Sequence, residues 1–226
     1  MEETNFVLLW KEQYEKIDES LAINKRLLTE IINQKAQSTL QSLIRFKARG
    51  IIAAVIYLIL LGTALFFAIA NYSSAANYFI ISMAAIFLIN VKALYDYIKH
   101  LVWINNINYN GSITQIQQKL VNLQLSVFQH TRFMFLQLPF WTTFTLSNKW
   151  FPQSVSWGYI VFQILFTGLF TYLAYFFYKN IRLQNVNKKW VRTLINGSGG
   201  KHVTKALEFY KELENFKGND YSNTGI

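Results

Sequence analysis

The sequence contains no cysteine and only three histidines. Without a thiol the chain can form neither a disulfide nor a thiolate metal site, and a cysteine nucleophile is excluded. The three histidines lie far apart, and none belongs to an HExxH metalloprotease motif. A GxxxxGKS/T phosphate loop and a GxSxG nucleophile elbow are also missing. We therefore expect a protein that is not an enzyme and that has no catalytic residue, metal site or cofactor.

Charge is almost missing from four long apolar stretches, residues 51–71, 78–94, 133–151 and 155–178. A helix needs about 20 mostly apolar residues to cross a hydrocarbon core about 30 Å thick. In the regions that contain these stretches, Lys92 and Lys149 are the only lysine, arginine, histidine or acidic residues. The pattern predicts an all-α polytopic membrane protein with four transmembrane helices, whose first partner is the lipid bilayer.

The lack of ionisable groups in the stretches also bears on transport. An ion-coupled transporter usually places such a group near the middle of the bilayer. Neutral groups do occur there, namely Asn90, Gln137 and Gln163, and Pro139 lies two residues after Gln137. Hydrogen bonds between helices are favoured for these groups over a permeation path. For Pro139, a kink packed against Thr142 or Gln163 is favoured over a small cavity.

The net charge of +10 is distributed unevenly. Arg45, Lys47 and Arg49 precede the first stretch, and residues 179–192 hold five basic residues and no acid, whereas the connection 71–77 is uncharged. Basic residues accumulate on the cytoplasmic side of membrane proteins. This distribution predicts cytoplasmic N- and C-termini and gives no reason to expect nucleic-acid binding.

The alternation of polar and apolar segments divides the chain into five parts. Each polar part carries helical periodicity, so we expect the cytosolic helices to form a small bundle. The parts are a cytosolic amphipathic helix (1–49), a first transmembrane hairpin (50–99), a cytosolic connection with an amphipathic helix (100–132), a second transmembrane hairpin (133–178), and a basic helix with a glycine-rich break and a terminal amphipathic helix (179–226).

An apolar stripe runs along the N-terminal helix at steps of three and four residues. It either packs on the protein's own cytosolic helices or forms the seam of a homo-oligomeric coiled coil. In the second case Asn24 fixes the register, because a buried asparagine in a seam tolerates few alternative alignments. The stripe consists of Trp10, Tyr14, Ile17, Leu21, Asn24, Leu28 and Ile31.

The same helix carries an acidic group of residues near its start. Glu12, Glu15, Asp18 and Glu19 form either a surface for a basic soluble cytosolic partner or a solvated face. Further along the chain, His100 and His130 could meet Asp96 as a mixed set of metal ligands. A simpler interpretation is an ion pair of Asp96 with a lysine at helical spacing, Lys92 or Lys99.

Three short segments carry a resemblance to a known group of proteins: residues 9–13 (LWKEQ), 17–21 (IDESL) and 136–143 (LQLPFWTT). They resemble uncharacterised small bacterial four-span inner-membrane proteins, some of which are encoded beside extracytoplasmic-function sigma factors. The resemblance implies the bacterial inner membrane and an anti-sigma-like role. The chain lacks the His-x3-Cys-x2-Cys motif of many zinc-binding anti-sigma factors, and no catalytic residue is transferred.

Two functions remain open from the sequence. The first is a membrane-anchored interaction or regulatory protein that presents cytosolic helices to a soluble protein. The alternative is a small homo-oligomeric channel or transporter that uses Asn90, Gln137 and Gln163. The first predicts exposed apolar side chains on the cytosolic helices, whereas the second needs a hydrated path.

Overall fold

The computed structural model describes the backbone of residues 2–109 and 111–223, and the side chains of residues 10–109 and 111–215. The described chain contains helices and no strands, which confirms the all-α part of the predicted fold class. Its helices are α1 (Glu2–Ala70), α2 (Asn77–Asn105), α3 (Ile113–Met134), α4 (Phe140–Thr143), α5 (Trp157–Asn180), α6 (Lys189–Gly197) and α7 (Gly200–Asn223), with 3-10 turns η1 (Ser74–Ala76), η2 (Phe135–Gln137) and η3 (Leu183–Asn185).

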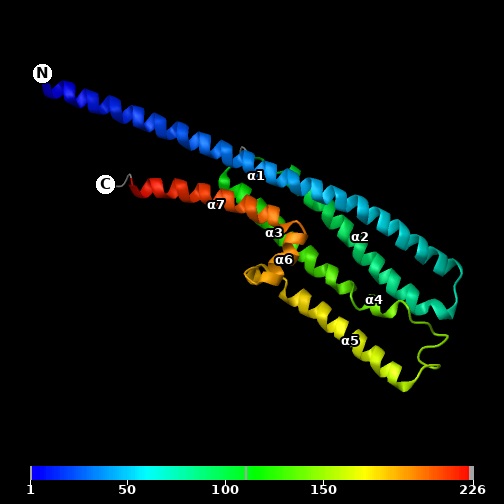
Figure 1. Ribbon diagram of the computed structural model, residues 1–226. Coiled ribbons are helices and arrows are strands. Elements are labelled where there is room, and N and C mark those ends of the chain that lie inside the picture. Colours follow the sequence, from blue (N-terminus) through cyan, green and yellow to red (C-terminus); the bar gives the residue numbers. More distant parts are fainter. Residues whose placement is uncertain (1, 110, 224–226) are drawn as a thin grey trace.

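Helix α1 is one uninterrupted helix of 69 residues. It joins the predicted N-terminal amphipathic helix to the first apolar stretch, since no proline interrupts it. At 1.5 Å per residue it is roughly 100 Å long. It runs along the whole molecule, its N-terminal end projects beyond the other helices, and α2 returns beside its C-terminal part (Figure 1).

Three helical segments of the described chain are long and apolar enough to cross a membrane: α1, η1 with α2, and α5. The predicted stretch 133–151 is broken instead. Helix α3 ends at Met134, η2 follows, and α4 has only four residues. Pro139 has no amide hydrogen and its ring clashes with the preceding helical turn, so a helix rarely continues through it. A continuous third spanning helix is therefore not confirmed.

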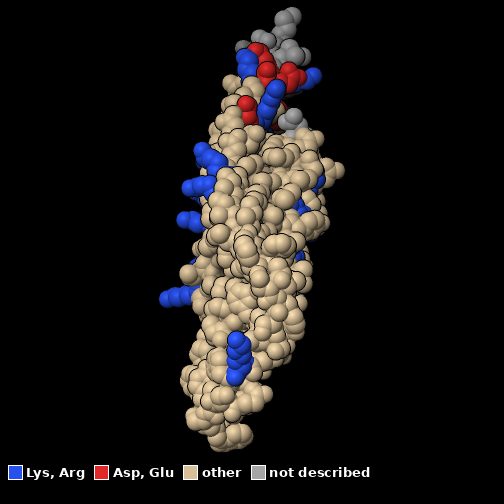
Figure 2. Space-filling model, turned by 90° about the vertical axis from the view of Figure 1, so that its right-hand side faces the viewer, with Lys and Arg blue, Asp and Glu red and all other residues tan. Residues whose placement is uncertain are grey.

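The molecule has an apolar half and a polar half. The apolar half comprises residues 51–95 and 133–178, and its two connections, before α2 and before α5, lie at the same end (Figure 1). Large apolar side chains on its surface are exposed, including Ile59, Leu60 and Phe66. Figure 2 shows that this end of the molecule is almost free of charged side chains. A surface of this kind is expected where lipid, not water, surrounds the protein.

The polar half is held by a core that α1, α2, α3 and α7 share. Hydrogen bonds support it: the Tyr210 hydroxyl donates to Asn33 Oδ1 (2.8 Å), and Asn33 Nδ2 donates to the Tyr109 carbonyl (3.0 Å). Burial raises the pKa of the Tyr210 phenol. The buried apolar residues of this core include Ile32, Ala36, Leu40, Leu43, Ile104, Leu120, Leu123, Val203, Leu207 and Leu213.

The junction between α6 and α7 depends on glycine. Gly199 has φ of +91°, and a Cβ there would lie 2.6 Å from Leu43 Cδ1 of α1. Only glycine combines this backbone conformation with so close an approach at little cost. The nearby Gly197 has open space around its Cα and no positive φ.

We expect Gly199→Ala to lower the free energy of unfolding by about 1–3 kcal/mol, through backbone strain and the contact with Leu43. The matched variant Gly197→Ala should leave it unchanged or raise it by up to about 1 kcal/mol. Thermal unfolding of both variants in detergent micelles measures this. Equal behaviour of the two variants would contradict the strained geometry.

Candidate functional sites

The apolar stripe of α1 continues out of the core of the polar half. Five helical turns separate Trp10 from Leu28 and Tyr14 from Ile32, so each pair lies on one face. Leu28 packs against the core and Ile32 is buried within it. Trp10, Tyr14 and Ile17 are exposed by 61%, 64% and 63%. The same face of α1 is therefore covered at Leu28 and Ile32 but exposed at Trp10, Tyr14 and Ile17, roughly three to six turns earlier.

The other residues of the predicted seam divide between these two environments. Leu21 and Leu28 are half-buried, and Asn24 is exposed. Ile31 is exposed by 46%, because the inward position of that turn belongs to Ile32 at 6%. Leu28 is the residue of the stripe that packs on this core. The periodicity contained no information about where the covering helices end.

The predicted acidic residues lie largely opposite the stripe. Glu12, Glu15, Asp18 and Glu19 are all exposed. At 100° per residue, Glu12 and Glu19 point away from Tyr14, and only Asp18 lies at the edge of the stripe. Glu12 accepts a hydrogen bond from Lys16 Nζ at 2.8 Å, an exposed pair one turn apart. The two surfaces therefore face different directions.

A buried polar cluster lies where the two halves of the molecule meet. Asp96 of α2 provides the carboxylate of the cluster. It accepts a hydrogen bond from Lys92 Nζ, one turn earlier in α2, so the predicted ion pair with a lysine at helical spacing is confirmed. His130 Nδ1 of α3 lies 3.2 Å from Asp96 Oδ2. A carboxylate only accepts hydrogen bonds, so Nδ1 carries the proton. Burial lowers the pKa of His130, although the hydrogen bond to Asp96 opposes that shift.

Helix α1 contributes Lys47 to the same cluster. Its side chain is fully buried, and Nζ has no hydrogen-bond partner among the described residues. Nζ lies 4.2 Å from the centre of the Tyr97 ring, a cation–π contact. The Tyr97 ring approaches because Gly50 has no side chain: a Cβ there would lie 2.6 Å from that ring. Lys47 also interacts electrostatically with Asp96.

His100 completes the cluster from α2. It is fully buried, and its Nε2 lies 2.9 Å from Ser126 Oγ of α3. Its ring centre lies 6.1 Å from that of His130. The fold thus brings His100, His130 and Asp96 into one region. Within the described chain, however, no three histidine or acidic side chains are arranged to hold a metal ion. The cluster is an electrostatic joint between α1, α2 and α3.

Sequence reasoning assigned Lys47 to membrane topology and missed its burial. The signal was nevertheless present, since Lys47 continues the inward steps of Ala36, Leu40 and Leu43 at intervals of three and four residues. A cation at an inward position of a helix implies a buried anion nearby. Asp96 is the only acidic residue between positions 31 and 207, so it was the available candidate.

The polar groups of the apolar half bond to each other. Asn90 Nδ2 donates to Gln137 Oε1 at 3.2 Å and to the Ile86 carbonyl at 2.8 Å. Gln163 Nε2 of α5 donates to the Thr142 carbonyl at 2.8 Å, and the Thr142 hydroxyl donates to the Pro139 carbonyl at 2.7 Å. Thr142 thus links the turn at Pro139 to Gln163 of α5. The bond from Gln163 gives the Thr142 carbonyl a side-chain partner from a neighbouring helix.

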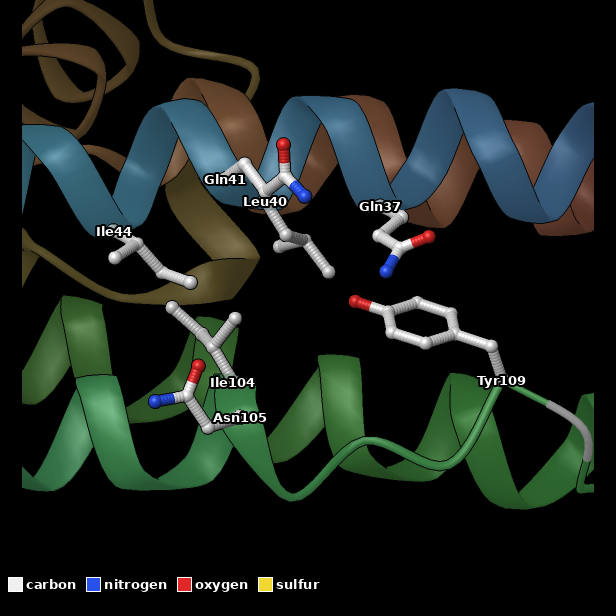
Figure 3. Close-up of a pocket in the computed structure, with 7 residues that line it drawn as sticks. All are labelled: Gln37, Leu40, Gln41, Ile44, Ile104, Asn105 and Tyr109. Atoms are coloured by element: carbon white, nitrogen blue, oxygen red, sulfur yellow. The ribbon is translucent and has the colours of Figure 1, made fainter.

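A small cavity lies between α1 and the end of α2 in the polar half. Its volume is about 140 Å³. Figure 3 shows the Tyr109 hydroxyl directed toward the Gln37 amide, while Ile44 and Ile104 face each other across the opposite part. Because its lining holds no charged or titratable group besides the phenol, the cavity suits a small neutral polar molecule and offers no general acid or base. It is lined by Gln37, Leu40, Gln41, Ile44, Ile104, Asn105 and Tyr109.

Comparison of the chain with protein-family models, with curated proteins and with solved structures finds no match.

The polar cluster should contribute to the free energy of unfolding, and substitutions of Asp96 and Lys47 test this. Asp96→Asn removes the negative charge that compensates the buried Lys47, so we expect a loss of about 3 kcal/mol. In a Lys47→Met background the same change should cost at least about 1 kcal/mol less, since the buried cation is absent. Unfolding of the four proteins in detergent measures the coupling.

The exposed pair of Glu12 and Lys16 supplies the control. Glu12→Gln should change the free energy of unfolding by less than about 0.5 kcal/mol, because water screens this pair. If Asp96→Asn cost the same with and without Lys47, the two residues would not be coupled.

Proposed function

We propose that this protein is a membrane-anchored interaction protein, which presents the N-terminal part of α1 to an apolar helix of a soluble cytosolic partner. The observation that carries the proposal is the exposed stripe at Trp10, Tyr14 and Ile17, which is continuous with the core formed by Leu28 and Ile32. A helix that covers the stripe would extend the same packing. Covering such side chains contributes roughly 1.5–3 kcal/mol each before the costs of association.

The charge of this segment favours a basic partner over a second copy. Residues 10–20 contain four acidic and two basic side chains, hence a net charge of 2 − 4 = −2. Two copies in contact would bring like charges together, whereas a basic protein is attracted and its association accelerated. The acidic residues opposite the stripe act through this field and not through direct contact. An anti-sigma-like role in a bacterial inner membrane would use the same surface.

The alternative of a channel finds less support. Asn90, Gln137 and Gln163 have their amide groups bonded to neighbouring helices or turns. A permeating ion or solute needs groups that are free to exchange partners. The bonds favour these residues as contacts between helices.

For the topology we propose four membrane crossings with both termini in the cytoplasm. The third crossing is the broken segment 133–151, which contacts α2 and α5 on either side. Such a segment is tolerated at membrane depth when other helices satisfy its backbone. Lys149, the one cation of this region, would then lie at the outer surface.

Reporter fusions test this topology. A phosphatase that is active only outside the cytoplasm should be active after Asn71 and after Ser154, and inactive after Asn108 or at the C-terminus. Three crossings would instead make the fusion after Ser154 inactive and the C-terminal fusion active. Because the four-crossing and three-crossing topologies predict opposite results after Ser154 and at the C-terminus, one set of fusions decides between them.

The docking surface is tested by replacing Tyr14 and Ile17 with serine in the full-length protein. We expect cross-linking in native membranes to recover a soluble protein with the wild type, and its recovery to fall at least tenfold with the variant. Deletion of residues 1–20 should have the same effect without loss of membrane insertion. The matched control is Ile52→Ser with Ile56→Ser, which changes exposed apolar residues of the same helix in the apolar half.

The outcomes distinguish three hypotheses for the exposed stripe: docking of a soluble partner, self-association, and no role in binding. A soluble protein lost with both the serine variant and the deletion, but kept with the control, supports docking at the stripe. Recovery of the protein's own second copy alone, sensitive to the same substitutions, would replace the soluble partner by self-association. A recovery that no variant alters would refute a role for this surface.

A further inference from the structure

A second binding site is indicated by a cavity between α3 and the connection from α5 to α6. We infer that this cavity binds the phosphate of an anionic phospholipid headgroup from the cytosolic leaflet. Its volume is about 120 Å³, which is enough for a phosphate group but not for a whole lipid. It is lined by Leu125, Phe128, Gln129, Arg132, Ile181, Arg182 and Leu183. The inference rests on the membrane-anchored placement proposed above.

Two arginines from separate elements line this cavity. Arg132 stands in the last turn of α3, and its Cζ lies 4.9 Å from the centre of the Tyr178 ring of α5. Arg182 follows the end of α5, where its backbone N–H donates to the Asn180 carbonyl at 2.9 Å. Stacking on Tyr178 limits the orientations of Arg132. A pair of guanidinium groups can bind the oxygens of one phosphate in a bidentate manner.

Within the described part of the chain, neither Arg132 nor Arg182 forms an ion pair. Residues 97–207 contain no aspartate or glutamate and eleven lysines and arginines. An anion bound in the cavity would therefore have to come from outside the chain.

The position and the walls of the cavity favour a lipid as the source of the phosphate. Arg132 directly precedes the apolar stretch that begins at residue 133, and Arg182 follows the end of α5 by two residues. Both lie at the boundary where lipid phosphates are found. Phe128 and Ile181 are buried and form apolar walls, which suit the glycerol and first methylene groups of a lipid. A free phosphate ion would gain nothing from such walls.

The test uses purified full-length protein in detergent, stripped of lipid and titrated with phosphatidylglycerol while native mass spectrometry counts bound lipid. Replacing both Arg132 and Arg182 with glutamine should weaken the binding at least tenfold. Arg182→Gln alone changes an exposed side chain, so it should weaken binding without disturbing the fold. The control, Lys188→Gln with Arg192→Gln, removes two exposed cations that do not line the cavity, and should bind as the wild type.

Two further probes distinguish the source of the anion. Phosphatidylcholine, which carries no net charge, should bind at least tenfold more weakly than phosphatidylglycerol. Soluble glycerol phosphate, added in large excess, should not displace the lipid; displacement would overturn the lipid as ligand in favour of a free phosphate compound. Equal loss of binding in the control variant would reduce the effect to bulk charge and also overturn the proposed site.

Extraction of membranes with alkaline carbonate separates this inference from the proposed function. If the protein stays in the membrane and shows no headgroup preference, only the lipid site fails. If carbonate releases the protein, the membrane-anchored function and the lipid site fail together.

Discussion

The carboxylate of Asp96 is the interaction on which the arrangement of the helices depends. It is the only acidic side chain between residues 31 and 207. Lys92 forms an ion pair with it, His130 lies within hydrogen-bond distance, and the buried Lys47 interacts with it electrostatically. Without this anion the buried ammonium of Lys47 would have no compensation, and a buried unpaired charge is among the costliest features a fold can contain. The cluster thus favours the alignment of the three helices in which Lys47 of α1, Asp96 of α2 and His130 of α3 lie close together.

The apolar half follows the same rule with neutral groups. Where the helix breaks at Pro139, the amide of Gln163 bonds the Thr142 carbonyl and the hydroxyl of Thr142 bonds the Pro139 carbonyl. Asn90 and Gln137 are each other's partners across α2 and the broken segment. In both halves, buried polar side chains join neighbouring elements, and much of the exposed surface of the apolar half consists of isoleucine, leucine and phenylalanine.

Features that depend on residues close in sequence could be predicted, and features that depend on distant neighbours could not. The helical class, the apolar stretches and the pairing of Lys92 with Asp96 follow from spacing and composition. The burial of Lys47 requires the approach of α2 at Gly50, and the exposure of Tyr14 depends on where the packing of other helices on α1 ends. Periodicity identifies an inward face of a helix but contains no information about what covers it.

The continuity of α1 has a mechanical consequence. A single helix connects the exposed residues near Ile17 to the apolar segment that begins after Gly50, without a flexible joint between them. The distance along the axis from Gly50 to Ile17 is roughly 50 Å at 1.5 Å per residue. If α1 pivoted as a rigid lever near Gly50, a tilt of about 10° within the bilayer would move the tip by roughly 9 Å. Changes in bilayer thickness, which tilt spanning helices, would then be amplified into displacements as large as the diameter of a helix.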